Sequence, residues 1–109
     1  MIQASYDSLM SVLPELREDL VKMRTERAQQ LANLRESKVQ GESDYVEVAI
    51  QRGALAALAD IDEALDRIDA GIYGACSSCG GEISPARLQF RPMAVNCADC
   101  QSRLERASA

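Results

Sequence analysis

Hydrophobic residues recur every three or four positions over the first third of the chain. The first five are spaced 4, 3, 4 and 3 residues apart, a pattern that marks one face of an α-helix. Arg27 and Ala28 interrupt the pattern, as at a four-residue stutter in a coiled-coil seam. The stripe consists of Leu9, Leu13, Leu16, Leu20, Met23, Leu31 and Leu34.

Pro14 bears on where this first helix begins. Proline is tolerated in the first turn of a helix but breaks its interior, because it lacks an N–H group. We therefore expect the helix to begin near Ser11 as N-cap and to run to about Lys38. Residues 1–10 are expected to form a looser lead-in.

A second stripe comes next, with spacings of 4, 3, 4, 3 and 4. Gly41 can reverse the chain between the two helices, Ser43 or Asp44 can cap the second one, and Gly71 is a natural C′ residue at its end. The members of the stripe are Ala54, Leu58, Ile61, Leu65, Ile68 and Ile72.

Two stripes joined by a short loop predict an antiparallel helical hairpin in which each apolar face covers the other. The hairpin occupies residues 1–70, with its tip near 40–49, and at 1.5 Å per residue it forms an arm about 40 Å long. Since the seam can be satisfied within one chain, we expect a monomer, although an a/d seam can also pair between two chains.

Composition narrows the function. The 109 residues include no histidine, which excludes Ser-His-Asp and Cys-His catalysis and histidine-bound metals. Phosphate loops and an open metal position are also missing, so we expect no enzyme. No secretory signal or membrane span is visible, which indicates a cytoplasmic protein.

All four cysteines lie in two C-x-x-C pairs, Cys76 with Cys79 and Cys97 with Cys100. The 17 residues between the pairs fit a four-thiolate structural zinc site, whose tetrahedral shell leaves no open position. A disulfide pair or a redox dithiol fits less well, because the chain shows no βαβ setting and would meet a reducing cytosol. A structural zinc can contribute ~10 kcal/mol or more to folding, which would offset a small core.

The residues around the cysteines predict the local structure of a second unit, 71–109. Gly80 and Gly81 suit a knuckle that turns N–H groups toward sulfur, and Asn96 precedes the second pair. A C-terminal helix is expected over 98–107, and Ser84-Pro85 reads as a helix cap followed by its first residue. The stretch RLQFRPMA is expected to be extended, with Leu88 and Phe90 packed inside.

The segment from about residue 65 to 105 resembles the DksA/TraR family of C4 zinc-finger proteins. The motifs G-x-Y-G-x-C-x-x-C-G, I-x-x-x-R-L, R-P-x-A and C-x-x-C-Q agree in residues and spacing. The resemblance implies a mainly α protein: a coiled-coil arm, a small four-cysteine zinc finger and a C-terminal helix. It also implies binding to bacterial RNA polymerase, with the arm entering the secondary channel to modulate initiation, for which no direct DNA contact is needed.

The resemblance also assigns site residues. Family members carry D-x-x-D-x-A at the tip, which looks like D-Y-V-E-V-A here, so Asp44, Glu47 and Ala49 are the counterparts, with glutamate replacing the second aspartate. Members that respond to the alarmone ppGpp place basic side chains near the base of the arm. Arg91 matches one such position, but Asp60 and Gln101 stand where lysines are expected, which counts against ppGpp dependence.

Several alternatives stay open. The acidic tip residues can simply favour a helix N-terminus. The cations on the outer half of the first helix can line a contact with an acidic channel or form an ordinary solvated face; they are Arg24, Arg27, Arg35 and Lys38. A different function is a zinc-ribbon module that binds another protein or nucleic acid. With a net charge of −5, the chain is poorly suited to neutralising phosphates.

Overall fold

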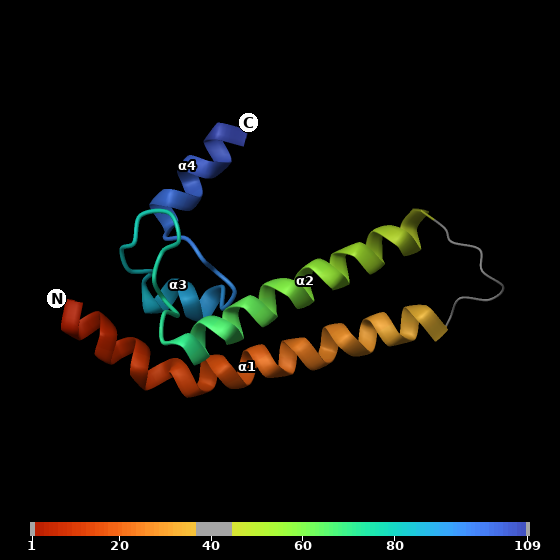
Figure 1. Cartoon of the computed structure of the whole chain (residues 1–109), viewed down its shortest axis with the longest axis horizontal. Coiled ribbons are helices and arrows are strands. Elements are labelled where there is room, and N and C mark those ends of the chain that lie inside the picture. The colour runs from red at the N-terminus through yellow and green to blue at the C-terminus, as the bar shows by residue number, and fades with distance from the viewer. Residues whose placement is uncertain (1, 37–44, 109) are drawn as a thin grey trace.

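The computed structural model describes residues 2–36 and 45–108, with side chains from residue 7 onward. Four helices succeed one another: α1 (Ile2–Glu36), α2 (Tyr45–Ala70), α3 (Pro85–Phe90) and α4 (Ala98–Ser108). The two long helices lie antiparallel and side by side, and the finger is attached at their base (Figure 1). The predicted fold class, a helical hairpin with a four-cysteine finger and a C-terminal helix after it, is confirmed. The predicted tip loop, the caps Ser43 and Asp44, and the helix end near Lys38 lie outside the described residues.

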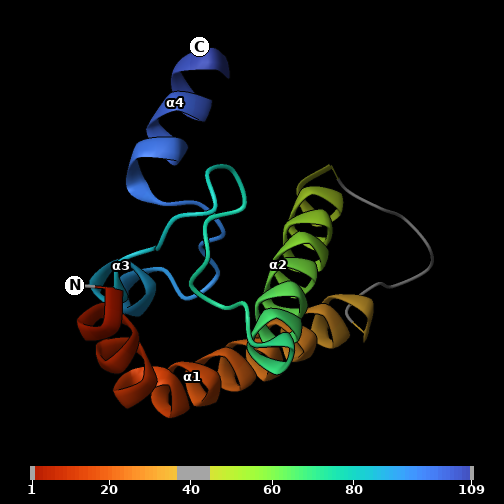
Figure 2. The same ribbon diagram turned by 60° about the vertical axis from the view of Figure 1, so that its left-hand side comes forward.

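The beginning of α1 differs from the prediction. The helix begins at Ile2, and Ser11 lies inside it, where its hydroxyl donates to the Ser8 carbonyl at 2.8 Å. Pro14 also lies inside the helix, and α1 changes direction in its N-terminal third in both views (Figures 1 and 2). A proline removes one backbone hydrogen bond of a helix and bends the helix at that point. The helix continues through the bend when tertiary packing holds the residues on both sides of the proline. Leu9 provides that packing, because it is buried in the core on the N-terminal side of the bend.

The predicted stripes form the seam of the hairpin. Leu20 and Ile61 have no exposed surface, and most other stripe members are buried or half-buried. Ala64, outside the predicted stripe, is also buried. Ile72 is an exception at 51 % exposure, because α2 ends before it and the chain turns away from the seam.

Gly71 ends α2 as predicted. Its φ of 76° places it in the left-handed region, and its N–H donates to the Ile68 carbonyl at 3.1 Å. The N–H of Ile72 donates to the Arg67 carbonyl at 3.0 Å, which completes a Schellman motif. The chain therefore leaves the arm at this turn, which leads to the first cysteine.

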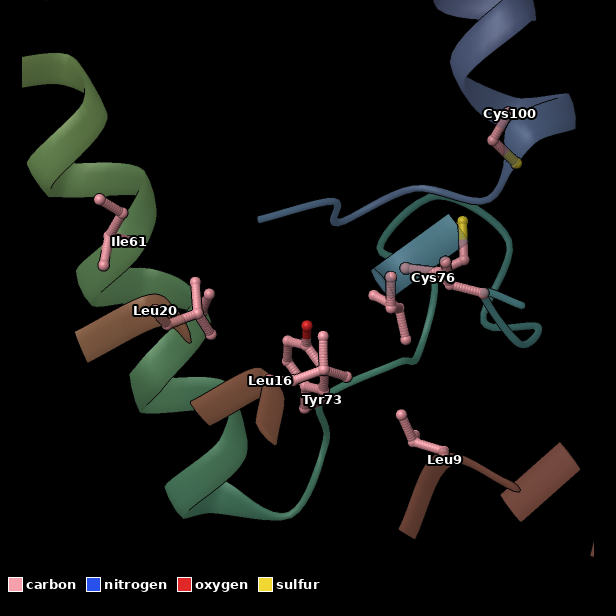
Figure 3. Packing of buried hydrophobic residues seen from close by; sticks show 10 residues of the cluster. Leu9, Leu16, Leu20, Ile61, Tyr73, Cys76 and Cys100 are labelled. Carbon is pink, nitrogen blue, oxygen red and sulfur yellow. The ribbon is translucent and has the colours of Figure 1, made fainter. Parts of the chain in front are cut away.

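A single apolar cluster joins the arm to the finger. Tyr73 lies beside Leu16 between the seam of the hairpin and Cys76 (Figure 3). The Tyr73 hydroxyl donates to the Pro92 carbonyl at 2.7 Å, so the buried ring keeps its polar end bonded. The cluster consists of Leu9, Leu16, Leu20, Ile61, Ala64, Tyr73, Cys76, Ile83, Leu88 and Cys100. The division at residue 70 stays a prediction, and the core runs across it.

The stretch expected to be extended is helical in its first half, residues 87–90, which belong to the short helix α3. Ser84 caps it, since its hydroxyl accepts the Arg87 N–H at 3.2 Å, and Pro85 occupies the first turn, as predicted. Leu88 is fully buried, but Phe90 is 80 % exposed, so the prediction that both pack inside is wrong for Phe90. In a helix, residues two positions apart point in different directions, whereas in a strand they share a face.

The C-terminal helix α4 confirms the predicted helix over 98–107 and extends it by one residue. It projects from the finger and stands apart from the two long helices in both views (Figures 1 and 2). In the ranges 2–36 and 45–108, no helix combines the length and apolar character needed to cross a membrane.

Candidate metal centre and arm tip

The four cysteines lie together in the finger. One ligand sulfur from each of Cys76, Cys79, Cys97 and Cys100 falls within 4.8 Å of all the others. A tetrahedral zinc with bonds of ~2.3 Å would separate its sulfurs by ~3.8 Å, close to the 4.0 Å between Cys79 Sγ and Cys97 Sγ. The four cysteines therefore form a site suited to a structural zinc ion, as expected.

The first pair sits on a knuckle between two short extended segments. An isolated antiparallel bridge joins Ala75 to Glu82, and Gly80, with a φ of 74°, reverses the chain between them. The N–H of Gly81 donates to Cys79 Sγ at 3.3 Å. The predicted knuckle is thus confirmed: glycine supplies the turn, and a backbone donor faces a sulfur.

The second pair begins α4. The Gln101 N–H donates to the Cys97 carbonyl at 2.9 Å, so Cys97 lies at the start of the helix and Cys100 in its first turn. The partial positive charge of a helix N-terminus favours thiolates there. Asn96 accepts a hydrogen bond from the Ser78 hydroxyl at 2.8 Å, which links the two knuckles.

The sulfurs differ in proton affinity. The Cys97 N–H, 3.3 Å from Cys76 Sγ, is the largest of the interactions that lower the pKa of Cys76 to about 6. The pKa of Cys100 is raised to about 12, first by its hydrogen bond with Cys97 and then by burial. Of these two thiols, Cys76 therefore loses its proton at the lower pH and Cys100 retains its proton to the higher pH. Since zinc binds thiolates, metal uptake displaces that proton.

Two arginines donate hydrogen bonds to backbone carbonyls next to the cysteines. Neither arginine was predicted to have this role from the sequence. Arg67 Nη1 donates to the carbonyl of Ala75, and Arg87 Nε donates to the carbonyl of Asn96, at 3.3 and 3.1 Å. Each acceptor immediately precedes the first cysteine of its pair. Arg87 appeared only as part of a motif, and its spacing from Cys97 carried no signal for this contact.

Arg91 lies on the surface at the end of α3. Its side chain is exposed, and its guanidinium carbon stands 6.0 Å from the centre of the Phe90 ring. Because the ring is 80 % exposed, the pair forms a small cationic and aromatic surface at the finger. Asp60 is also exposed, and Gln101 donates its side-chain amide to Glu105 at 3.2 Å.

The described part of the tip is the first turn of α2. Glu47 is half-buried there and Ala49 is exposed, while Asp44 lies outside the described residues. Tyr45 is 93 % exposed and Val46 61 % exposed. The outer end of the arm therefore presents apolar side chains beside a carboxylate.

The basic residues of α1 behave differently from one another. Arg24 Nε contacts Asp62 Oδ1 of α2 at 2.6 Å, so this cation is paired across the hairpin although no acidic residue lies three or four positions from it in α1. Arg27 donates to Gln30 Oε1 at 3.1 Å, and Arg35 is exposed in the last turn. Lys38 is outside the described residues.

Comparisons with known proteins agree with this geometry. The family model of the prokaryotic dksA/traR C4-type zinc finger matches residues 71–106. An uncharacterized protein of Aquifex aeolicus is 44% identical over 54 residues, which cover 50% of this chain and 37% of the relative. The RNA polymerase-binding transcription factor DksA of Caulobacter vibrioides is 43% identical over 49 residues, 45% of this chain and 34% of the relative. The matched region therefore spans about a third of the length of these curated relatives.

A solved structure resembles the whole chain. The transcription factor DksA2 from Pseudomonas aeruginosa superposes with a TM-score of 0.59 at 27% identity, covering 96% of this chain and 86% of that one. The likeness thus includes the hairpin as well as the finger. Residues 71–106 form a zinc finger of the DksA/TraR C4 type, and the chain is a DksA-like zinc-finger protein.

Proposed function

We propose that this protein regulates transcription by binding bacterial RNA polymerase and inserting its helical arm into the secondary channel. The observation that carries the proposal is the likeness to DksA2 over 96% of the chain, which covers arm and finger together. Relatives matched at the finger are named RNA polymerase-binding transcription factors. The zinc finger anchors the base of the arm in this proposal, and no chemical reaction is involved.

The outer end of the arm is proposed to act near the catalytic centre. Asp44 and Glu47 would bring carboxylates toward a magnesium-bearing, positively lined site, and Ala49 would lie beside them. Tyr45 and Val46, which are adjacent and exposed at this end of the helix, are proposed to add apolar surface to the contact.

The finger is proposed to supply a second contact. The surface formed by Phe90 and Arg91 combines an aromatic ring with a cation, two groups enriched at protein interfaces. Asp60 and Gln101 provide no cation at the base of the arm, so the proposed action does not require ppGpp. The protein is proposed to act as a cytoplasmic monomer.

A binding measurement tests the proposal. Immobilised protein should bind purified bacterial core RNA polymerase, and Phe90→Ala with Arg91→Ala should weaken binding by about tenfold, or ~1.4 kcal/mol. The matched control replaces Leu104 and Arg103 of α4, an exposed apolar and cationic pair elsewhere on the finger. No binding by the wild-type protein would contradict the proposal and favour the alternative, a zinc module for another protein or nucleic acid.

A further inference from the structure

Arg67 is a residue of the arm whose side chain hydrogen-bonds to the first knuckle. It lies in the last turn of α2, where its carbonyl accepts the N–H groups of Ile72 and Tyr73 at 3.0 and 3.1 Å. Its side chain is 17 % exposed and extends past the C-terminal end of α2 to the finger. One residue therefore ends the helix and also contacts the knuckle beyond it.

The guanidinium group of Arg67 donates hydrogen bonds to the residues on either side of one cysteine. Nη1 donates to the Ala75 carbonyl at 3.3 Å, and Nη2 donates to the Ser77 hydroxyl at 2.5 Å. These two acceptors flank Cys76. Glu63, one turn earlier in α2, holds the remaining edge of the group, with its Oε1 3.6 Å from Nε. The planar fork of arginine suits two acceptors at fixed positions, which a lysine ammonium does not match.

The knuckle that Arg67 holds is itself tied to the rest of the finger. The N–H of Ser77 donates to the Val95 carbonyl at 2.8 Å, and the N–H of Cys76 donates to the Gly81 carbonyl at 2.8 Å. A force on this knuckle is therefore passed to the whole metal centre. Arg67 thus connects α2 with the centre and not merely with a loop.

The backbone between arm and knuckle is poorly suited to fix a direction alone. Gly71 and Gly74 have φ angles of 76° and 92°, and glycine populates several backbone regions at little cost. The Arg67 side chain spans this turn, from α2 before it to the knuckle after it. The side chain therefore restricts the backbone conformation of a segment in which Gly71 and Gly74 allow several conformations.

We propose that Arg67 is a positioning residue that fixes the direction of the arm relative to the zinc centre. The proposal rests on the proposed function, because an arm that enters a channel has to hold its direction against the finger that docks. With zinc held by the four cysteines, the knuckle would present Ala75 and Ser77 at fixed positions, and Arg67 would align α2 with them.

Arg87 provides a matched control within the same fold. It also donates to a carbonyl that precedes a cysteine, but it comes from α3 and lies wholly within the finger. Replacing Arg87 perturbs the metal centre without removing a link to α2. Comparing the Arg87 variant with the Arg67 variant therefore separates the general effect of losing an arginine near the metal centre from the loss of the link to α2.

Residual dipolar couplings of backbone amides test the proposal with zinc-loaded full-length protein. In the wild type, one alignment tensor should fit both α2 and the finger. In Arg67→Met, the two parts should require different tensors while each molecule still binds one zinc, measured by atomic absorption. Arg67→Lys should show a smaller separation, and Arg87→Met should retain one tensor. If Arg67→Met fails to retain zinc, Arg67→Lys is judged by the same comparison of tensors. A single tensor in the variant that retains zinc, or equal divergence in Arg87→Met, would overturn the proposal.

The functional readout is kept separate. Arg67→Met should still bind RNA polymerase but should lose at least half of the wild-type effect on transcript yield. An unchanged effect in a variant with separated tensors would contradict the positioning role. A wild-type protein that does not bind polymerase would contradict the proposed function and leave the tensor comparison to decide the role of Arg67 in the arm.

Discussion

Leu9 occupies the space into which a side chain at position 74 would project. A Cβ built on Gly74 would lie 2.8 Å from Leu9 Cδ2, a distance that real contacts essentially never show. Leu9 belongs to the N-terminal part of α1 and Gly74 to the turn that leads to the first cysteine. Leu9 therefore packs closely against the turn at Gly74.

Gly74→Ala should therefore destabilise the protein more than Gly71→Ala does. Both glycines have positive φ, but nothing lies within 4 Å of a Cβ at Gly71. The backbone strain common to both should cost about 1 kcal/mol, and the clash with Leu9 should add about 1–3 kcal/mol at Gly74 only. Denaturant unfolding with zinc present measures both variants. Equal losses would show that the end of the Leu9 side chain moves aside at no cost.

Zinc removal should unfold the finger. The core of residues 71–108 is small, and two of its buried members, Cys76 and Cys100, belong to the metal site. Structural zinc contributes about 10 kcal/mol or more in small domains, so chelation should collapse the amide dispersion of residues 72–108 in NMR spectra. Added zinc should restore the spectrum, whereas added magnesium should not. Near-native helicity together with a dispersed spectrum after chelation would contradict this expectation.

Tyr73 should make the fold sensitive to alkali. Burial raises the pKa of Tyr73 to about 12, above its ordinary value of 10.0. Between these values the unfolded chain loses the phenolic proton and the folded chain retains it, so stability is complete below pH 10 and falls as pH rises toward 12. The loss amounts to up to about 3 kcal/mol.

The free energy of unfolding, measured at pH 8 and at about pH 11, checks this expectation. Tyr73→Phe should be less stable than the wild type at pH 8, because it lacks the hydrogen bond to Pro92. The difference between the two proteins should shrink at the higher pH, since phenylalanine has no proton to lose. A difference independent of pH would mean that Tyr73 does not govern the alkaline loss.

The long-range pattern of the chain was predictable, while several local details depended on tertiary contacts. Spacing alone indicated the seam through Leu20 and Ile61, since helical periodicity reports which face is buried. The predicted start of α1 was wrong because Pro14 was interpreted as a residue of the first helical turn. The burial of Leu9 against the finger holds the helix on both sides of the proline, and no local signal reveals that.

The metal centre was predictable for a different reason. Ligand identity and spacing are local properties, so the two C-x-x-C pairs and the knuckle glycine Gly80 were visible directly. The contacts of Arg67 and Arg87 were not visible, because they join residues through the folded path of the chain. Phe90 was misplaced when a helical segment was read as extended.

In vitro transcription from a ribosomal RNA promoter with purified bacterial RNA polymerase tests the action of the arm most directly. The variant carries Asp44→Asn and Glu47→Gln, and the matched control carries Asp66→Asn and Asp69→Asn near the base of α2, which removes the same charge. The wild type and the control should change transcript yield, whereas the tip variant should bind polymerase without that effect. A tip variant as effective as the wild type would contradict a role for the acidic tip at the catalytic centre.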